Sequence, residues 1–186
     1  MKIKKLLLVG VVSLVGVSSV SAQGTVNFVN RITGTLDAPV YLNGVGGTLL
    51  SGANFLAQLY YGTSPTESSL TPITDPPTPF RTGTGAGYWN AGADSTRVLP
   101  VIAPNSVVYL QVRAWDSTFG ATYDIAKAAG GVWGDSNVFT AIAGGGSPPV
   151  APANMTGLTS FTLVPEPSTI ALGILGAVAL LLRRRN

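Results

Sequence analysis

A strict alternation of apolar side chains over residues 106–116 constrains the fold of this 186-residue chain more than any other pattern. Successive side chains of a β-strand point to opposite faces, so an apolar residue at every second position predicts a strand with one buried face. The predicted buried face carries Val108, Leu110, Val112 and Ala114. The opposite face is amphipathic and is expected to lean toward solvent; it carries Tyr109, Gln111, Arg113 and Trp115.

Shorter runs of the same kind predict further strands at residues 24–30, 38–42, 54–61, 136–142 and 158–164. Clusters rich in glycine and proline separate several of them, as turns between strands do. Residues 123–129 are a helical candidate, but so short a segment is expected to form a turn or two on a crossover loop rather than a packed helix. These features predict one all-β domain over residues 23–164, a single β-sandwich of jelly-roll or Greek-key type, with a β-barrel as the alternative.

The chain contains no histidine and no cysteine, and this excludes several kinds of active site. Ser-His-Asp and Cys-His catalysis, thiolate metal sites and histidine metal ligands all need one of these residues. Glycosidases can work with two carboxylates, but Glu67 is the sole glutamate of residues 23–164 and nothing selects an aspartate as its partner. The sequence therefore predicts a protein that is not an enzyme and uses no cofactor.

The charges between the two ends of the chain are few and mixed. Five basic and seven acidic residues give residues 23–164 a net charge of −2, so nucleic acid is not an expected partner. Three aspartates, Asp116, Asp124 and Asp135, lie in a turn-rich stretch of the kind that Ca²⁺ uses. Because no calcium-loop spacing is present, capping and turn-forming roles are the simpler interpretation, and no metal site is predicted.

The three tryptophans are the best candidates for ligand binding in the middle of the chain. Trp89 follows Tyr88, Trp133 lies beside glycines in a predicted loop, and Trp115 belongs to the amphipathic face described above. An exposed aromatic face can stack on a sugar ring while nearby Asn and Asp side chains bind the hydroxyls. Trp89, Trp115 and Trp133 are therefore candidate glycan-stacking residues. The alternative is that they fill the ends of the domain as core.

The N-terminus has the organisation of a secretory signal peptide. A basic start is followed by a mostly apolar run over residues 6–20 and then by small residues, which is the pattern that signal peptidase reads. We expect a signal peptide over residues 1–22, cut by signal peptidase between Ala22 and Gln23. A retained membrane helix is the alternative, although the run is shorter than the ~20 residues of a membrane span.

The last 22 residues have a three-part organisation of their own. A proline-flanked acidic motif comes first, an apolar run over residues 169–182 follows, and a basic cluster ends the chain: Pro165, Glu166 and Pro167, then Arg183, Arg184 and Arg185. A helix of that length rises about 21 Å, which is short against a hydrocarbon core of ~30 Å. It suits a transient membrane anchor, with the arginines held on the cytoplasmic side.

Motif, apolar run and basic end, in this order, resemble a PEP-CTERM sorting signal. The resemblance covers residues 165–186 only. It implies that an exosortase, a membrane-embedded cysteine transpeptidase, recognises Pro165, Glu166 and Pro167 and cuts nearby. It also implies a Gram-negative-type host with an exopolysaccharide or biofilm matrix. A simple tail anchor with a chance Pro-Glu-Pro is the alternative.

Together the two ends predict a protein that is exported across the inner membrane, transiently anchored, and then delivered to the cell envelope or the extracellular matrix. Its expected partners are signal peptidase, an exosortase-like transpeptidase and the membrane. The domain between the ends is expected to be structural or adhesive. The alternative function is a carbohydrate-binding module for matrix exopolysaccharide that acts through the tryptophans.

Overall fold

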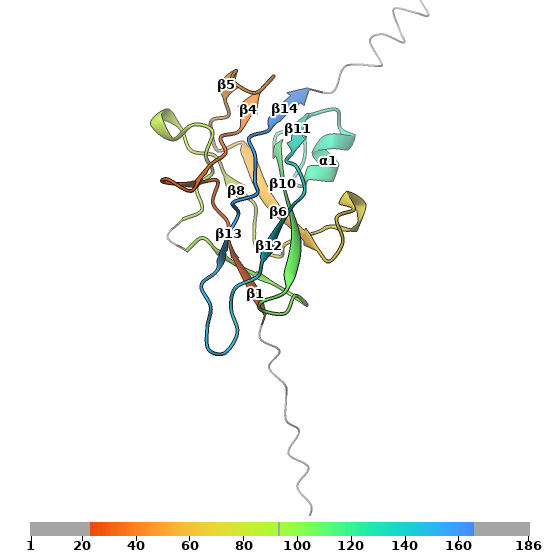
Figure 1. Cartoon of the computed structure of the whole chain (residues 1–186). Coiled ribbons are helices and arrows are strands. Elements are labelled where there is room, and N and C mark those ends of the chain that lie inside the picture. Colours follow the sequence, from red (N-terminus) through yellow and green to blue (C-terminus); the bar gives the residue numbers. More distant parts are fainter. Residues whose placement is uncertain (1–22, 93, 166–186) are drawn as a thin grey trace, which may run out of the picture.

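The computed structural model describes residues 23–92 and 94–165, and over these residues the chain is mostly β-structure with one α-helix (Figure 1). The all-β prediction is confirmed. The predicted signal peptide and transmembrane helix, and the sorting motif beyond Pro165, lie outside the described residues. No helix within the described residues is long and apolar enough to cross a membrane.

The strands in chain order are β1 (Gly24–Asn27), β2 (Arg31–Ile32), β3 (Leu36–Asp37), β4 (Tyr41–Leu42), β5 (Thr48–Leu49), β6 (Phe55–Gly62), β7 (Thr71–Pro72), β8 (Thr78–Pro79), β9 (Thr96–Leu99), β10 (Val107–Asp116), β11 (Val132–Asp135), β12 (Phe139–Ile142), β13 (Ala153–Asn154) and β14 (Thr162–Pro165). The helix α1 (Tyr123–Ala128) lies between β10 and β11. Two 3₁₀ turns are η1 (Glu67–Ser69) and η2 (Gly83–Gly85).

Two long antiparallel strands, β6 and β10, form the centre of the largest sheet. Its strand order is β5-β4-β14-β11-β10-β6-β7, and β12 and β8 pair with β10 and β6 beside this path. The face of β10 that the alternation predicted to be buried is fully buried along its length. A period of two with one buried face fixes the register of a strand, because a slip by one residue would turn every apolar side chain to the wrong side.

A second sheet, in the order β13-β1-β9, contributes to the same core. Val26 of β1, the neighbouring Phe28 and Leu99 of β9 belong to one buried cluster with the inner faces of β6 and β10. One hydrophobic core therefore joins the two sheets. It is built from side chains that lie far apart in the sequence, which is the usual arrangement in an all-β domain.

The helix α1 covers the other face of β10, where it builds a second, smaller apolar cluster. Tyr123 and Ala126 of α1 pack with Trp115, and Leu56 and Trp133 pack at the edge of this cluster. The expectation that residues 123–129 would form no packed helix is therefore wrong, although the position of the helix was right. The expectation that the amphipathic face of β10 leans toward solvent is wrong at Gln111 and Trp115, which are fully buried.

Each of the shorter segments predicted to be a strand contains an observed strand, but most of the observed strands are shorter than predicted. The strand β11 was not predicted. The glycines beside Trp133 predicted a loop, whereas this residue lies in β11. Gly134 has a different role: a Cβ added there would lie 2.1 Å from the carbonyl oxygen of Thr162 in β14. A glycine inside a strand can mark the close approach of another backbone rather than a turn.

The first and last described residues lie at opposite ends of the domain (Figure 1). Gln23 is exposed and directly precedes β1, and Pro165 is exposed at the end of β14. β14 pairs with β11 in antiparallel and with β4 in parallel orientation. The chain therefore leaves the domain from a strand that is held on both sides.

Candidate functional site

Trp89 is a core residue and not an exposed stacking platform. Its side chain is 2% exposed, its ring lies parallel to that of Phe28 at a centroid distance of 4.8 Å, and its Nε1–H donates to the carbonyl of Phe28 at 3.0 Å. Phe80 packs edge-on against the same ring. The glycan-stacking assignment of Trp89 is wrong, because the ring is buried and packs against Phe28 and Phe80.

Trp115 is also buried, with an exposed fraction of 0%. Its Nε1–H donates to the carbonyl of Gly120 at 3.0 Å, and Tyr123 of α1 contacts its ring edge-on. A buried tryptophan needs such a partner for its N–H. The glycan-stacking assignment of Trp115 is therefore wrong as well, and the physical reason is the cover that α1 provides.

Trp133 is partly exposed in β11, and the ammonium group of Lys127 lies over its ring. The Lys127 Nζ lies 3.7 Å from the centroid of its ring, and Tyr123 packs edge-on against it. A lysine ammonium over the face of an indole is a favourable cation–π contact. A sugar could stack on that face only after displacing Lys127. Trp133 pairs with Trp115 across β10 and β11, but Trp115 is fully buried, so these two neighbouring rings offer no shared exposed surface.

Beside these aromatic rings, Arg113 connects the outer face of β10 to α1, the helix that covers this face. Its guanidinium carbon lies 4.1 Å from the centroid of Tyr60 and 5.3 Å from that of Tyr123. It donates to the carbonyl of Glu67 and to Oε1 of Gln111. Burial raises the pKa of both phenols, and for Tyr123 the charge and the hydrogen bond of Asp135 raise the pKa further. These neutral phenols and the bound guanidinium form a structural network.

The acidic side chains of the described residues serve local structure. Glu67 accepts a hydrogen bond from Gln111 Nε2 at 3.0 Å. Asp116 accepts from the backbone N–H and the hydroxyl of Thr118 in a turn, and Asp135 accepts from the phenol of Tyr123 at 2.9 Å. Asp124 lies in the first turn of α1. Over residues 23–92 and 94–165 no three acidic side chains come together as a group that could hold a metal ion.

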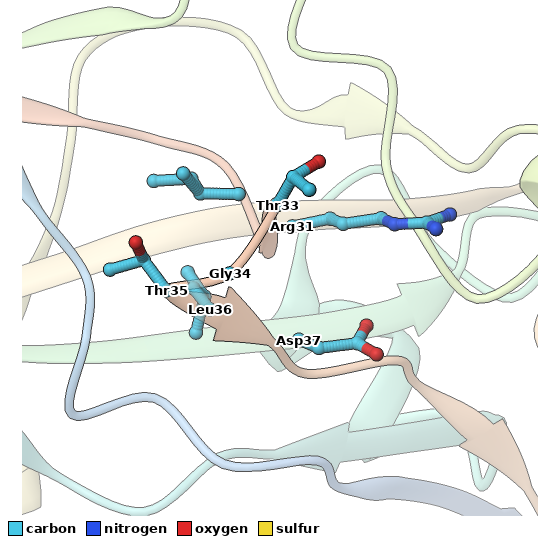
Figure 2. Close-up of a pocket in the computed structure, with 7 residues that line it drawn as sticks. Arg31, Thr33, Gly34, Thr35, Leu36 and Asp37 are labelled. Atoms are coloured by element: carbon cyan, nitrogen blue, oxygen red, sulfur yellow. The ribbon is translucent and has the colours of Figure 1, made fainter.

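Two adjoining hollows lie around the hairpin of β2 and β3, and Trp89 is the one predicted glycan-stacking residue among the residues that line them. The first, of about 380 Å³, is lined by residues 31–37 (Figure 2). The second, of about 390 Å³, shares Arg31 and Thr33 with the first, and the segment that precedes the hairpin and the segment from Arg81 to Trp89 complete it. Its lining residues are Val29, Asn30, Arg31, Thr33, Arg81, Thr84, Gly85, Tyr88 and Trp89.

Arg31 and Asp37 lie directly opposite each other in this hairpin and extend to the same side of it (Figure 2). Tyr88 contacts both side chains. Its phenol donates to Asp37 Oδ1 at 2.6 Å, and the guanidinium carbon of Arg31 lies over its ring at 4.9 Å from the centroid. The hydrogen bond to Asp37 and partial burial raise the pKa of the phenol, against the opposing charge of Arg31. Tyr88 therefore stays a neutral donor.

A buried asparagine holds this site in shape. The Nδ2 of Asn30 donates to the carbonyls of Ala38 and Gly87 at 2.9 and 3.0 Å, and its Oδ1 accepts from the backbone N–H of Trp89. One side chain thus fastens the β2–β3 hairpin to the segment that carries Tyr88. Gly87 has a φ of 85°, a backbone conformation that residues other than glycine rarely adopt.

No protein-family model, curated protein or solved structure matches this chain.

Proposed function

We propose that this chain is an exported, non-enzymatic protein of the cell envelope or extracellular matrix, which an exosortase-like transpeptidase processes at a PEP-CTERM sorting signal. The observation that carries the proposal is the order of three features that begins at Pro165, the last residue of β14. They are the motif of residues 165–167, the apolar run of residues 169–182 and the basic end of residues 183–185. Each has a separate physical role: recognition, transient anchoring and topology.

The position of Pro165 supports the proposal. It is the last residue of β14 and is exposed, so the motif begins at the end of the last strand and outside the core. Gln23, the expected first residue of the mature protein, is exposed at the opposite end. A peptidase at either predicted site would therefore act on chain outside the hydrophobic core, and the domain would not need to unfold for processing.

We further propose that the domain is a β-sandwich of jelly-roll or Greek-key type with a structural or adhesive role. Two sheets that share one core support this architecture. The carboxylates support a role without catalysis, since Glu67 and Asp135 are bound to Gln111 and Tyr123 rather than to each other across a cleft. Glycosidases place two carboxyl groups on either side of the scissile bond.

The substitution Glu166→Ala tests the sorting function in a host that carries an exosortase. Intact mass spectrometry of the wild type should give a chain from Gln23 to the neighbourhood of Pro165, with or without an added group. Glu166→Ala should be exported but keep the apolar run and the basic end. Ser168→Ala, which lies just outside the motif, is the matched control and should be processed as the wild type is.

Two results would contradict the proposal. One is a Glu166→Ala protein that still accumulates in the shorter form. The other is a wild-type mature protein that retains Arg183 to Arg185, which would make the chain an ordinary tail-anchored protein.

A further inference from the structure

Two arginines line the same hollow, and their side-chain N–H groups have no acceptor among the described residues. Cationic side chains are otherwise few in this domain. The described residues contain five: Arg31, Arg81, Arg97, Arg113 and Lys127. Arg97 forms an ion pair, Arg113 donates to two acceptors, and Lys127 lies over an indole ring. The side chains of Arg31 and Arg81 form no ion pair or hydrogen bond with any described residue, and both line the hollow of about 390 Å³.

The arrangement around Arg31 leaves its N–H groups available. Its guanidinium lies over the ring of Tyr88, and a guanidinium in such a contact keeps its in-plane donors for a ligand. The nearby carboxylate does not occupy these donors: Asp37 forms no ion pair with Arg31, and its Oδ1 accepts from the phenol of Tyr88 at 2.6 Å. The phenol thus separates the one acid of the site from the guanidinium opposite it.

Arg81 is placed by its backbone and by a glycine. Its N–H donates to the carbonyl of Tyr88 at 2.9 Å, which keeps the two residues side by side. Its aliphatic stem lies over Gly85, where an added Cβ would meet Arg81 Cβ at 2.9 Å and Cδ at 3.0 Å. A glycine here leaves room for the stem. Arg81 thus lines the hollow and has no charged partner among the described residues.

We propose that this hollow binds the carboxylate of an acidic saccharide, that is, a uronate unit of a polysaccharide. Two guanidinium groups suit a carboxylate. Within this hollow the hydroxyls of Thr33 and Thr84 suit the sugar hydroxyls. Asp37 lines the adjoining hollow, where it could accept from a further sugar hydroxyl but would oppose a simple anion with no hydroxyl donors.

The size and lining of the hollow favour a saccharide over an acidic peptide. About 390 Å³ lies in the range of small-molecule sites. Peptide and protein partners gain most of their affinity from apolar anchors in dry pockets. The exposed residues that line this hollow are all polar, namely Arg31, Thr33, Arg81 and Thr84. The inference deepens the proposed function by naming a class of matrix partner, and it replaces the buried tryptophans with different binding residues.

The test is isothermal titration of the purified full-length chain, in mild detergent, with short oligogalacturonates. Neutral cello-oligosaccharides of equal length and oligoglutamate are the comparison ligands. We expect binding of oligogalacturonate only. Arg31→Gln and Arg81→Gln should each weaken it about tenfold or more, since each removes a charge-assisted contact. Lys127→Gln removes the same charge outside the hollow and should leave the affinity unchanged.

Arg81→Gln keeps the test decisive if Arg31→Gln affects folding, because the Arg81 side chain has no bonded partner among the described residues. Lack of oligogalacturonate binding, or equal binding by the wild type and both arginine variants, would overturn the proposal. Equal affinity for the neutral glycan would overturn the role of the carboxylate, and equal affinity for oligoglutamate would overturn the saccharide. None of these results depends on C-terminal processing, so they are distinguishable from failure of the sorting function.

Discussion

Gly134 joins β11 to β14, the strand that leads into the sorting motif, and Gly134→Ala should destabilise the domain strongly. An added Cβ would lie 2.1 Å from the Thr162 carbonyl oxygen, 2.9 Å from its carbon and 3.1 Å from Leu163 Cα. Non-bonded carbon contacts are normally ~3.5 Å or longer. All three atoms belong to the backbone of β14, so no side chain can rotate away, and the strands must separate by about 1 Å.

The expected cost follows from what this separation breaks. Loss of two ladder hydrogen bonds costs about 2 kcal/mol, and partial exposure of the buried Leu163 adds about 1–2 kcal/mol. The smaller entropy of the unfolded alanine chain offsets about 0.4–1 kcal/mol. The net loss is about 2–4 kcal/mol, which for a domain of this size lowers the Tm by about 6–12 °C.

Thermal unfolding followed by intrinsic tryptophan fluorescence measures this effect, because Trp89 and Trp115 are buried. Gly62→Ala is the matched control. It is also a strand glycine with an ordinary φ, but its Cβ would meet the Leu70 side chain at 3.0 Å and the Ser69 carbonyl at 3.3 Å. The leucine can move, so the control should stay within about 1 kcal/mol of the wild type. A Gly134→Ala protein as stable as this control would refute the reasoning.

Two further substitutions test the cluster under α1. Trp115→Ala should cost about 3–5 kcal/mol, the usual penalty for truncating a fully buried tryptophan, and a urea midpoint close to that of the wild type would contradict its role as core. Tyr123→Phe should flatten the alkaline loss of stability. The unfolded phenol ionises near pH 10, but burial and Asp135 raise its folded pKa, so this contribution is present below pH 10 and is lost at higher pH by up to about 1.4 kcal/mol per pH unit. Equal slopes above pH 10 for wild type and variant would contradict this assignment.

The strands that could be predicted are those whose own side chains carry the pattern. β6 and β10 alternate over many residues, so their buried faces were evident from the sequence. Strands of two residues such as β2 and β3 carry no period, because they are defined by backbone pairing across a turn. β11 was hidden for a related reason: Gly134 matters for what lies against it, and that neighbour is 28 residues away in the sequence.

Trp115 is buried because α1 covers it, and a helix as short as α1 is not expected from the sequence to pack. A six-residue helix is too short to be stable alone, yet α1 buries Trp115 because its own Tyr123 and Ala126 complete an apolar cluster. The hollow at Arg31 was invisible for another reason. Its two arginines are 50 positions apart, and each is isolated among uncharged residues in the sequence. Only the fold brings them together.

Pro165 belongs both to the last strand and to the proposed recognition motif, and the pairing of β14 explains why the sheet should end there. Tyr41 N–H donates to the carbonyl of Phe161, and Asn43 N–H donates to that of Leu163, so alternate residues of this segment face β4. Positions 165 and 167 are the next two in that series, and both are proline. A proline has no N–H to donate to a ladder. The structure therefore has no N–H to donate toward β4 at Pro165, the first residue of the proposed motif. From the sequence, the second proline of the motif is expected to lack the same donor, which disfavours extension of the sheet on the side of β4.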